Sequence, residues 1–261
     1  MSDQSHRSDP RILNRRSLEV DHRRQAGILR PGMSVLDVGC GTGAITAGIA
    51  KAVGLAGSVV GVDRDESLLE VARQEHGNVG NLRFERGDAL SLPFEHCFDV
   101  VTAARTLQWV SRPEKALLEM TKASRSGGQI IVLDYNHEAN TWEPDPPSEF
   151  RRFYEAFLQW RAANDWDNRM AEHLPELFRS AGITGVQVSV EDEIAGADDP
   201  NFSPAAAIWT AVIQGAGPQI VASGFLREGE RLAAERVYEA WAKTHLRRQT
   251  LRMSAVWGFV P

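Results

Sequence analysis

The stretch VLDVGCGTGA, residues 35 to 44, decides the fold. Its apolar run ends at three closely spaced glycines, and residues with helical spacing follow. Glycines at such a turn let the backbone approach a ligand, and the free N–H groups at the start of a helix attract negative charge. The stretch therefore predicts a strand, a turn that binds the charged part of a nucleotide-like ligand, and a helix.

An acid inside the predicted strand, Asp37, narrows the choice of ligand. Residues 39 to 44 also satisfy the dinucleotide fingerprint G-x-G-x-x-(G/A), so the glycines alone leave an NAD(P)-dependent dehydrogenase open. A carboxylate beneath the turn would repel a pyrophosphate, whereas a ligand with an ammonium group beside a carboxylate would use both the acid and the helix N-terminus. S-adenosylmethionine has such an amino-acid end.

Short apolar runs alternate with helical patterns through the first half of the chain, which is typical of stacked βα units. We predict strands at 33–39, 57–63, 81–88, 98–104 and 128–135, a sixth at 183–193 and a seventh at 248–259. Helices are expected at 43–54, 65–77, 112–128, 148–165, 169–182 and 229–245. The predicted fold is α/β, a Rossmann-like, seven-stranded, mostly parallel sheet with helices on both faces.

The order of these segments also predicts how the chain is divided. Residues 1–30, which are rich in arginine, are expected to form a helical segment ahead of a main domain over 31–261. A helical cap is expected after the fifth strand, with elements at about 136–182 and 196–228.

Composition excludes several classes of function. The net charge of −6 argues against a nucleic-acid partner, because phosphate binding needs a basic face. The polar start resembles no signal peptide and no apolar run approaches the roughly 20 residues of a membrane span, so we expect a cytoplasmic protein without a membrane partner. Two cysteines without CxxC spacing support neither a disulfide framework nor a zinc site, and no metal is expected.

Four motifs in register resemble those of class I S-adenosylmethionine-dependent methyltransferases. LDVGCGTG at 36–43 is similar to the first, and VVGVDRDES at 59–67, RGDALSLPF at 86–94 and FDVVTAARTLQWV at 98–110 follow in the family's order. The resemblance covers roughly residues 30 to 135. It implies a methyltransferase that binds S-adenosylmethionine and releases S-adenosylhomocysteine.

The resemblance also implies which residues contact the cofactor. Asp63 is expected to accept hydrogen bonds from both ribose hydroxyls, and Asp88 to accept one from the adenine amino group. The further cofactor residues are Asp37, Gly39, Cys40, Gly41, Thr42 and Gly43 in the first motif, Arg64 after the second strand, Ala89 beside the adenine, and Ala104 and Arg105 after the fourth strand.

The methyl acceptor is less well defined. Pieces such as LPF and PEKALLEM resemble methyltransferases of quinone biosynthesis, whereas LQWV at 107–110 is similar to trans-aconitate and malonyl-carrier methyltransferases. No acidic metal cluster accompanies the fourth strand, so we expect metal-independent, in-line methyl transfer to a small molecule. Six of the seven tryptophans follow residue 140, which suits an apolar or aromatic acceptor, although aromatic residues at helical spacing are also ordinary core.

Residues beyond the fifth strand are the candidates for catalysis, because open α/β sheets bind ligands at the carboxyl ends of their strands. His137 is the candidate base, and Trp109, Tyr135, Asn136 and Trp142 are candidate substrate contacts. Each could instead be a packing or turn residue. Two alternatives to a methyltransferase stay open, which are the NAD(P)-dependent dehydrogenase and a non-catalytic module that binds S-adenosylmethionine.

Overall fold

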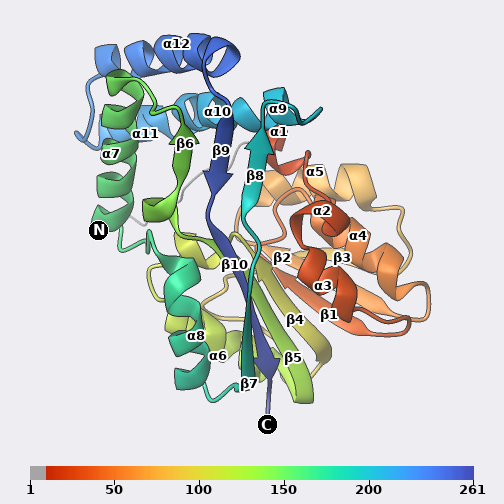
Figure 1. The fold of residues 1–261 in the computed structure, drawn as a ribbon. Helices are drawn as coiled ribbons and strands as arrows, with labels where there is room; N and C mark the ends of the chain where they lie inside the picture. The colour runs from red at the N-terminus through yellow and green to blue at the C-terminus, as the bar shows by residue number, and fades with distance from the viewer. Residues whose placement is uncertain (1–9) are drawn as a thin grey trace.

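A computed structural model describes residues 10–261 and confirms the predicted sheet (Figure 1). Seven strands lie in the order β3-β2-β1-β4-β5-β10-β7, with β10 antiparallel to both of its neighbours and the other pairs parallel. The strands are β1 (Ser34–Val38), β2 (Ser58–Asp63), β3 (Leu82–Arg86), β4 (Phe98–Ala104), β5 (Ser124–Tyr135), β7 (Thr184–Val190) and β10 (Met253–Phe259).

Alternating side chains of the strands supply two cores, one on each face of the sheet. Helices α6 (Pro113–Ala123) and α8 (Met170–Ser180) cover one face, where Leu36, Val38 and Val101 are buried. Helix α4 (Ala44–Val53) covers the other face over Val35 and Val100. Helix α5 (Glu66–His76) packs beside α4 on β2 and β3.

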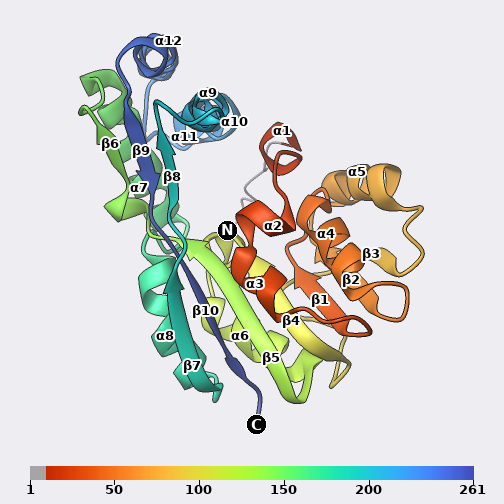
Figure 2. The ribbon, with the colours of Figure 1, turned by 45° about the vertical axis from the view of Figure 1, so that its right-hand side comes forward.

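The N-terminal segment also lies on the α4 face of the sheet (Figure 2). Its described part forms three short helices, α1 (Pro10–Leu13), α2 (Leu18–Asp21) and α3 (Arg23–Ile28), while residues 1–9 of the predicted segment lie outside the described residues. His22 anchors the segment to the sheet, because its Nε2 lies 3.1 Å from the Thr102 hydroxyl of β4.

A second layer stands over the carboxyl ends of the parallel strands (Figure 1). It contains a three-stranded antiparallel sheet, β6-β9-β8, and an aromatic core built chiefly from α7 and α12. Its elements are β6 (Thr141–Glu143), α7 (Ser148–Ala163), β8 (Glu193–Gly196), α9 (Phe202–Ala206), α10 (Ile208–Gly215), α11 (Gly217–Ala222), α12 (Glu228–Thr244) and β9 (Arg248–Leu251). We call this layer the cap.

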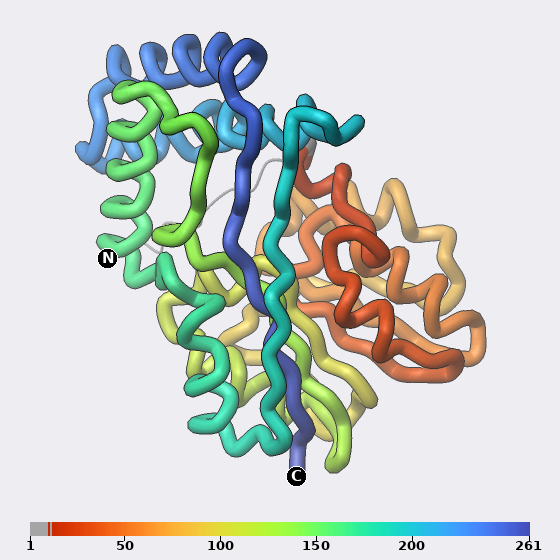
Figure 3. Tube along the Cα trace, viewed as in Figure 1, coloured from red at the N-terminus to blue at the C-terminus, as the bar shows by residue number. Residues whose placement is uncertain are grey.

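The sixth and seventh predicted strands each divide between the two sheets. In Figure 3 the Cα trace runs on from β7 into β8 and from β9 into β10. The strand bounds leave only a short break in each case. The breaks fall at residues 191–192 and at Arg252, and Asp192 bridges them by accepting from the Arg252 guanidinium and the Met253 N–H. The prediction of two single strands was wrong because period-two alternation does not register such a bend.

Other predicted boundaries also need correction. The helix expected at 112–128 ends at Ala123, because residues from Ser124 onward join β5 and Ser124 pairs with Phe98. Residues 141–143, for which no strand was predicted, form β6, which pairs with β9. Helix α8, expected in the cap, packs on β10, β7 and β5, whereas α12 packs in the cap on α7. The division of the chain at residue 31 stays a prediction.

One apolar stretch contradicts the expectation that no segment is long enough to span a membrane. Residues Phe202–Ala222 reach that length and apolar composition. In the fold they are three successive helices, α9, α10 and α11, and Trp209, Ile213 and Ile220 are buried in the cap core.

Candidate active site

A cavity of about 1230 Å³ lies between the carboxyl ends of the parallel strands and the cap. One half is bounded by the ends of β1 to β4, including Gly39, Asp63 and Asp88. The other half is bounded by the loop after β4 and by cap residues such as Phe157 and Trp209. We call these the cofactor half and the acceptor half.

The turn after β1 requires glycine at two positions for steric reasons. Gly39 has φ +77°, and a Cβ there would lie 2.3 Å from the Thr106 hydroxyl of the loop after β4. Gly43, the N-cap of α4, has φ +78°, and a Cβ there would lie 2.5 Å from the ring of Phe84. Both backbones therefore approach neighbouring elements closely, which brings the turn against the loop after β4.

Asp37 is buried beneath this turn. Its side chain accepts a hydrogen bond of 2.7 Å from the Thr46 hydroxyl. Burial raises the pKa of Asp37 to about 6, and the Thr46 hydrogen bond opposes that rise only in part. A cation placed beside Asp37 would stabilise the ionised form of its carboxyl group, which burial disfavours.

A small hollow of about 30 Å³ opens beside Asp37, between the glycine turn and the N-terminal segment. Thr42 lines it, and the Thr42 hydroxyl is buried without a hydrogen-bond partner in the described part of the chain. The first residue of α4, Ala44, also lines the hollow and brings the free N–H end of that helix to it.

Two further acids stand in the cofactor half. Asp63 accepts hydrogen bonds from the Gly41 N–H at 2.8 Å and the Asp65 N–H at 3.0 Å, and burial raises its pKa against these donors. Asp88 is exposed to the cavity and accepts from the Leu90 N–H at 2.9 Å. A carboxylate oxygen has two lone pairs, so Asp63 keeps acceptor capacity for a diol.

This set of groups fits the cofactor that the sequence resemblance implies. Asp37 and the unsatisfied Thr42 hydroxyl suit an amino-acid end, Asp63 suits two ribose hydroxyls, and Asp88 suits an amino group on a base. The residues that line the two cavities include every predicted cofactor residue except Gly43, which caps α4. The individual cofactor contacts stay predictions.

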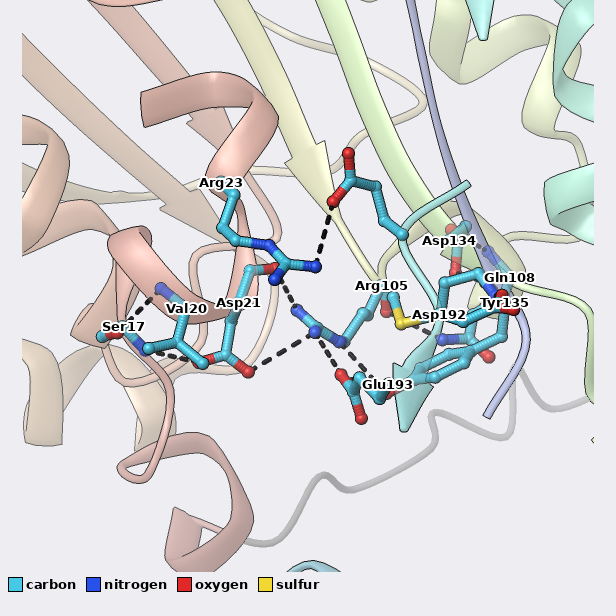
Figure 4. Close-up of polar contacts among 12 residues, drawn as sticks. Ser17, Val20, Asp21, Arg23, Arg105, Gln108, Asp134, Tyr135, Asp192 and Glu193 are labelled. Atoms are coloured by element: carbon cyan, nitrogen blue, oxygen red, sulfur yellow. Dashed lines mark hydrogen bonds and ion pairs between the residues drawn. The ribbon is translucent and has the colours of Figure 1, made fainter. Parts of the chain in front are cut away.

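Arg105 lines the cavity, and its side chain joins three parts of the molecule (Figure 4). Its buried guanidinium donates to Tyr135 on β5, to the backbone and side chain of Asp21 on α2, and to Glu193 on β8. Burial alone would lower the pKa of Arg105, but Tyr135, Glu193 and Asp21 together raise it. Its φ of +58° lies in the left-handed region that favours glycine, so the surrounding contacts must hold it there. The predicted cofactor residue thus lines the cavity while its charge binds the N-terminal segment and the cap.

Aromatic and aliphatic side chains line the acceptor half. Trp109 lies edge-on to both Phe157 and Trp166, at ring centroid distances of 6.5 and 5.2 Å. Further apolar lining residues from the cap include Ile208, Trp209, Val212 and Leu251. Sequence patterns did not single out Phe157, Ile208, Val212 or Leu251, because helical spacing cannot distinguish core from cavity lining.

His137, the predicted base, is held through one of its two ring nitrogens. Gln108 donates to the Arg105 carbonyl through Nε2, so its Oε1 accepts from His137 Nε2 at 2.6 Å. His137 Nδ1 is buried without a hydrogen-bond partner among residues 10–261. Burial and the nearby Arg161 cation lower the pKa of His137 well below its usual range. The ring is therefore neutral at physiological pH.

The four predicted substrate residues divide into two pairs. Trp109 and Tyr135 line the cavity. Asn136 is not among the lining residues, and its side chain donates to Glu172. Trp142 is also absent from the lining, donates to Gln249 and packs edge-on against Phe150 in the cap core. Asn136 and Trp142 thus support the structure around the cavity.

Comparisons with known proteins agree with this geometry. Residues 29–182 match a family model described as a methyltransferase domain. Demethylmenaquinone methyltransferase from Staphylococcus aureus is 31% identical over 179 residues, which is 61% of this chain and 71% of that protein.

Two solved structures share the fold. Phosphoethanolamine N-methyltransferase 2 of Haemonchus contortus, in complex with phosphomonomethylethanolamine and S-adenosylhomocysteine, aligns with a TM-score of 0.58 at 16% identity. That alignment covers 94% of this chain, which spans about half (52%) of the longer protein. A SAM-dependent methyltransferase from Aquifex aeolicus aligns with a TM-score of 0.54 at 16% identity and covers 98% of this chain and 100% of that one. The protein therefore belongs to the class I S-adenosylmethionine-dependent methyltransferases, and S-adenosylmethionine is its cofactor.

Proposed function

We propose that this enzyme methylates a small molecule with an apolar or aromatic body, bound between the loop after β4 and the cap. The observation that carries the proposal is the apolar lining of the acceptor half, contributed by separate parts of the chain. A volume of about 1230 Å³ exceeds the roughly 300–1,000 Å³ of a pocket for one ligand, so it suits a cofactor together with an acceptor. The name of the Staphylococcus aureus relative, which specifies demethylmenaquinone as its substrate, agrees with a small-molecule acceptor.

The cofactor, when bound, supplies a methyl group on a cationic sulfur. The chain's own residues then have two tasks, which are to orient the acceptor in line with that group and to exclude water. Trp109 forms one wall of the acceptor half, and Trp209 and Val212 contribute another from the cap. Within residues 10–261 no group of three acidic, histidine or cysteine side chains is placed to hold a metal ion, and our proposal is metal-independent.

We propose a positioning role for His137 in place of the predicted base. A neutral imidazole with a strongly lowered pKa is a weak base, and Gln108 already accepts from its Nε2. The Gln108 backbone N–H in turn donates to Asp134 at 3.1 Å, and Arg161 donates to the Gln108 carbonyl at 2.9 Å. His137 thereby helps to fix the loop that carries Trp109.

A substitution that fills the acceptor half tests the proposal. Val212→Trp in α10 adds bulk where Val212 lines the cavity, and Val221→Trp in α11 is the matched control, because Val221 packs on the same core without lining it. Purified variants are incubated with S-adenosylmethionine and a panel of phenols, quinols, carboxylic acids and amines, and release of S-adenosylhomocysteine is measured.

We expect the wild type and Val221→Trp to methylate a member of the panel. Val212→Trp should raise KM for that acceptor at least tenfold while the Kd for S-adenosylhomocysteine stays unchanged. Equal KM values for the two variants would refute the proposed position of the acceptor. Turnover with a protein or nucleic acid and with no member of the panel would refute the small-molecule class.

A further inference from the structure

Arg16 is a cation at the junction of the two cavities. It lies in the short connection between α1 and α2, and it lines both the large cavity and the small hollow beside Asp37. The large-cavity lining also includes Ile12 and Leu13 from α1. The N-terminal segment therefore forms one wall of the cofactor half.

Close packing between glycine and leucine fixes the position of this wall. A Cβ on Gly48 of α4 would lie 2.7 Å from the Cβ of Leu18, so only glycine lets α2 approach α4 this closely. A Cβ on Gly41 would likewise lie 2.9 Å from the Leu13 side chain. Arg16 lies between Leu13 and Leu18 in the sequence. The packing of these two leucines therefore positions Arg16 beside the glycine turn.

The acids nearest to Arg16 are bound by another cation. Asp21 and Glu193 attract Arg16 electrostatically, yet both form their ion pairs with the Arg105 guanidinium. In the part of the chain that the structure describes, no carboxylate lies within ion-pair distance of Arg16. Its charge at the cavity wall is thus available to a ligand anion.

Other residues that line the same hollow supply complementary groups. Asp37 offers a negative charge, and the Thr42 hydroxyl and the N-terminal end of α4 offer hydrogen-bond donors. A cation and an anion that line the same hollow suit a zwitterion, with its ammonium group at the acid and its carboxylate at the arginine.

We propose that Arg16 binds the carboxylate of the cofactor's amino-acid end. Asp37 faces the ammonium group of the same end, and Thr42 donates a hydrogen bond to the carboxylate. The sequence motifs give no sign of this residue, because it lies outside the stretch of resemblance, 30 to 135, and belongs to a basic segment that otherwise suits a solvated helix.

Binding measurements with and without the carboxylate isolate this contact. The variants are Arg16→Ala, Arg16→Lys and, as a matched control, Arg15→Ala, which removes the same charge from an exposed neighbour that does not line either cavity. The ligands are S-adenosylmethionine and decarboxylated S-adenosylmethionine, which keeps the ammonium group and the sulfonium. Isothermal titration calorimetry gives each Kd, and thermal unfolding confirms that each variant is folded.

We expect Arg16→Ala to weaken S-adenosylmethionine roughly 10- to 100-fold, the effect of losing one charge-assisted hydrogen-bonded pair. Its affinity for the decarboxylated ligand should equal that of the wild type, and Arg15→Ala should change neither. Arg16→Lys should retain part of the preference for the carboxylate. The proposal would be overturned if the ratio of the two Kd values were the same in Arg16→Ala as in the wild type. This holds whether neither affinity changes or both fall by the same factor.

Discussion

Lowering the pH should weaken the binding of the cofactor's amino-acid end through Asp37. The ammonium group of S-adenosylhomocysteine is expected to bind the ionised form of this acid, and burial raises the pKa of Asp37 to about 6 in the free protein. Protons therefore compete with the ligand below that pH. Affinity must fall as the pH falls, because the bound ammonium group favours the carboxylate and lowers the pKa of Asp37 in the complex.

The expected size follows from the ionised fraction of the free protein. With a pKa of about 6, roughly ten-elevenths of Asp37 is ionised at pH 7 and about one-eleventh at pH 5. The Kd for S-adenosylhomocysteine should therefore rise about tenfold between pH 7 and pH 5, with most of the change below pH 6.

Calorimetric titrations at several pH values between 5 and 8 test this reasoning. The control ligand is 5′-methylthioadenosine, which has the adenosine without the amino-acid end and should bind with little dependence on Asp37. Asp37→Asn should bind S-adenosylhomocysteine weakly and should flatten its pH dependence. A parallel slope for both ligands, or the wild-type slope in Asp37→Asn, would show that another group titrates and would refute the assignment.

Two further substitutions test the rest of the site. Asp63→Ala removes the acceptor of the Gly41 N–H and of both expected ribose hydroxyls, so calorimetry should show the Kd for S-adenosylhomocysteine rising roughly 10²- to 10⁴-fold, with Glu85→Ala unchanged. Arg105→Ala leaves two carboxylates without their cation and should lower the free energy of unfolding in urea by about 3 kcal/mol. The exposed pair of Arg125 provides the comparison, since Arg125→Ala should cost less than about 1 kcal/mol.

The cofactor half could be predicted from sequence because its chemistry is local. The turn after β1 needs glycine where φ is positive, and Asp63 sits at a strand end that the alternation of apolar runs already marks. Each of these constraints lies within a few residues of the chain. The predicted strands β1 to β4 and their order along the chain are accordingly confirmed.

The acceptor half could not be predicted because distant segments build it. Phe157 belongs to one apolar face of a predicted helix, and no helix was predicted around Val212. Only the packing of α7 and α10 decides which of their side chains border a cavity. The bend at Arg252 has the same origin, since it depends on a second sheet whose strands come from 141–143 and 193–196. The periodicity of apolar residues indicates which side chains are buried, but it does not indicate which helix or strand they pack against.

Asp37 and Thr42, which are predicted to bind the cofactor, share one physical property: their polar atoms are incompletely satisfied within the described chain. Burial disfavours the ionised form of Asp37 and leaves the Thr42 hydroxyl without a partner in the described chain. A raised carboxyl pKa lowers stability as the pH rises from about 4 through about 6, because the unfolded chain ionises more readily. A cofactor with an ammonium group and a carboxylate would satisfy both groups at once, so its binding would stabilise the fold. A buried acid that lowers the stability of the fold is a better indicator of the ligand than the glycines around it, because glycine turns bind many ligands and an acid beneath the turn suits few.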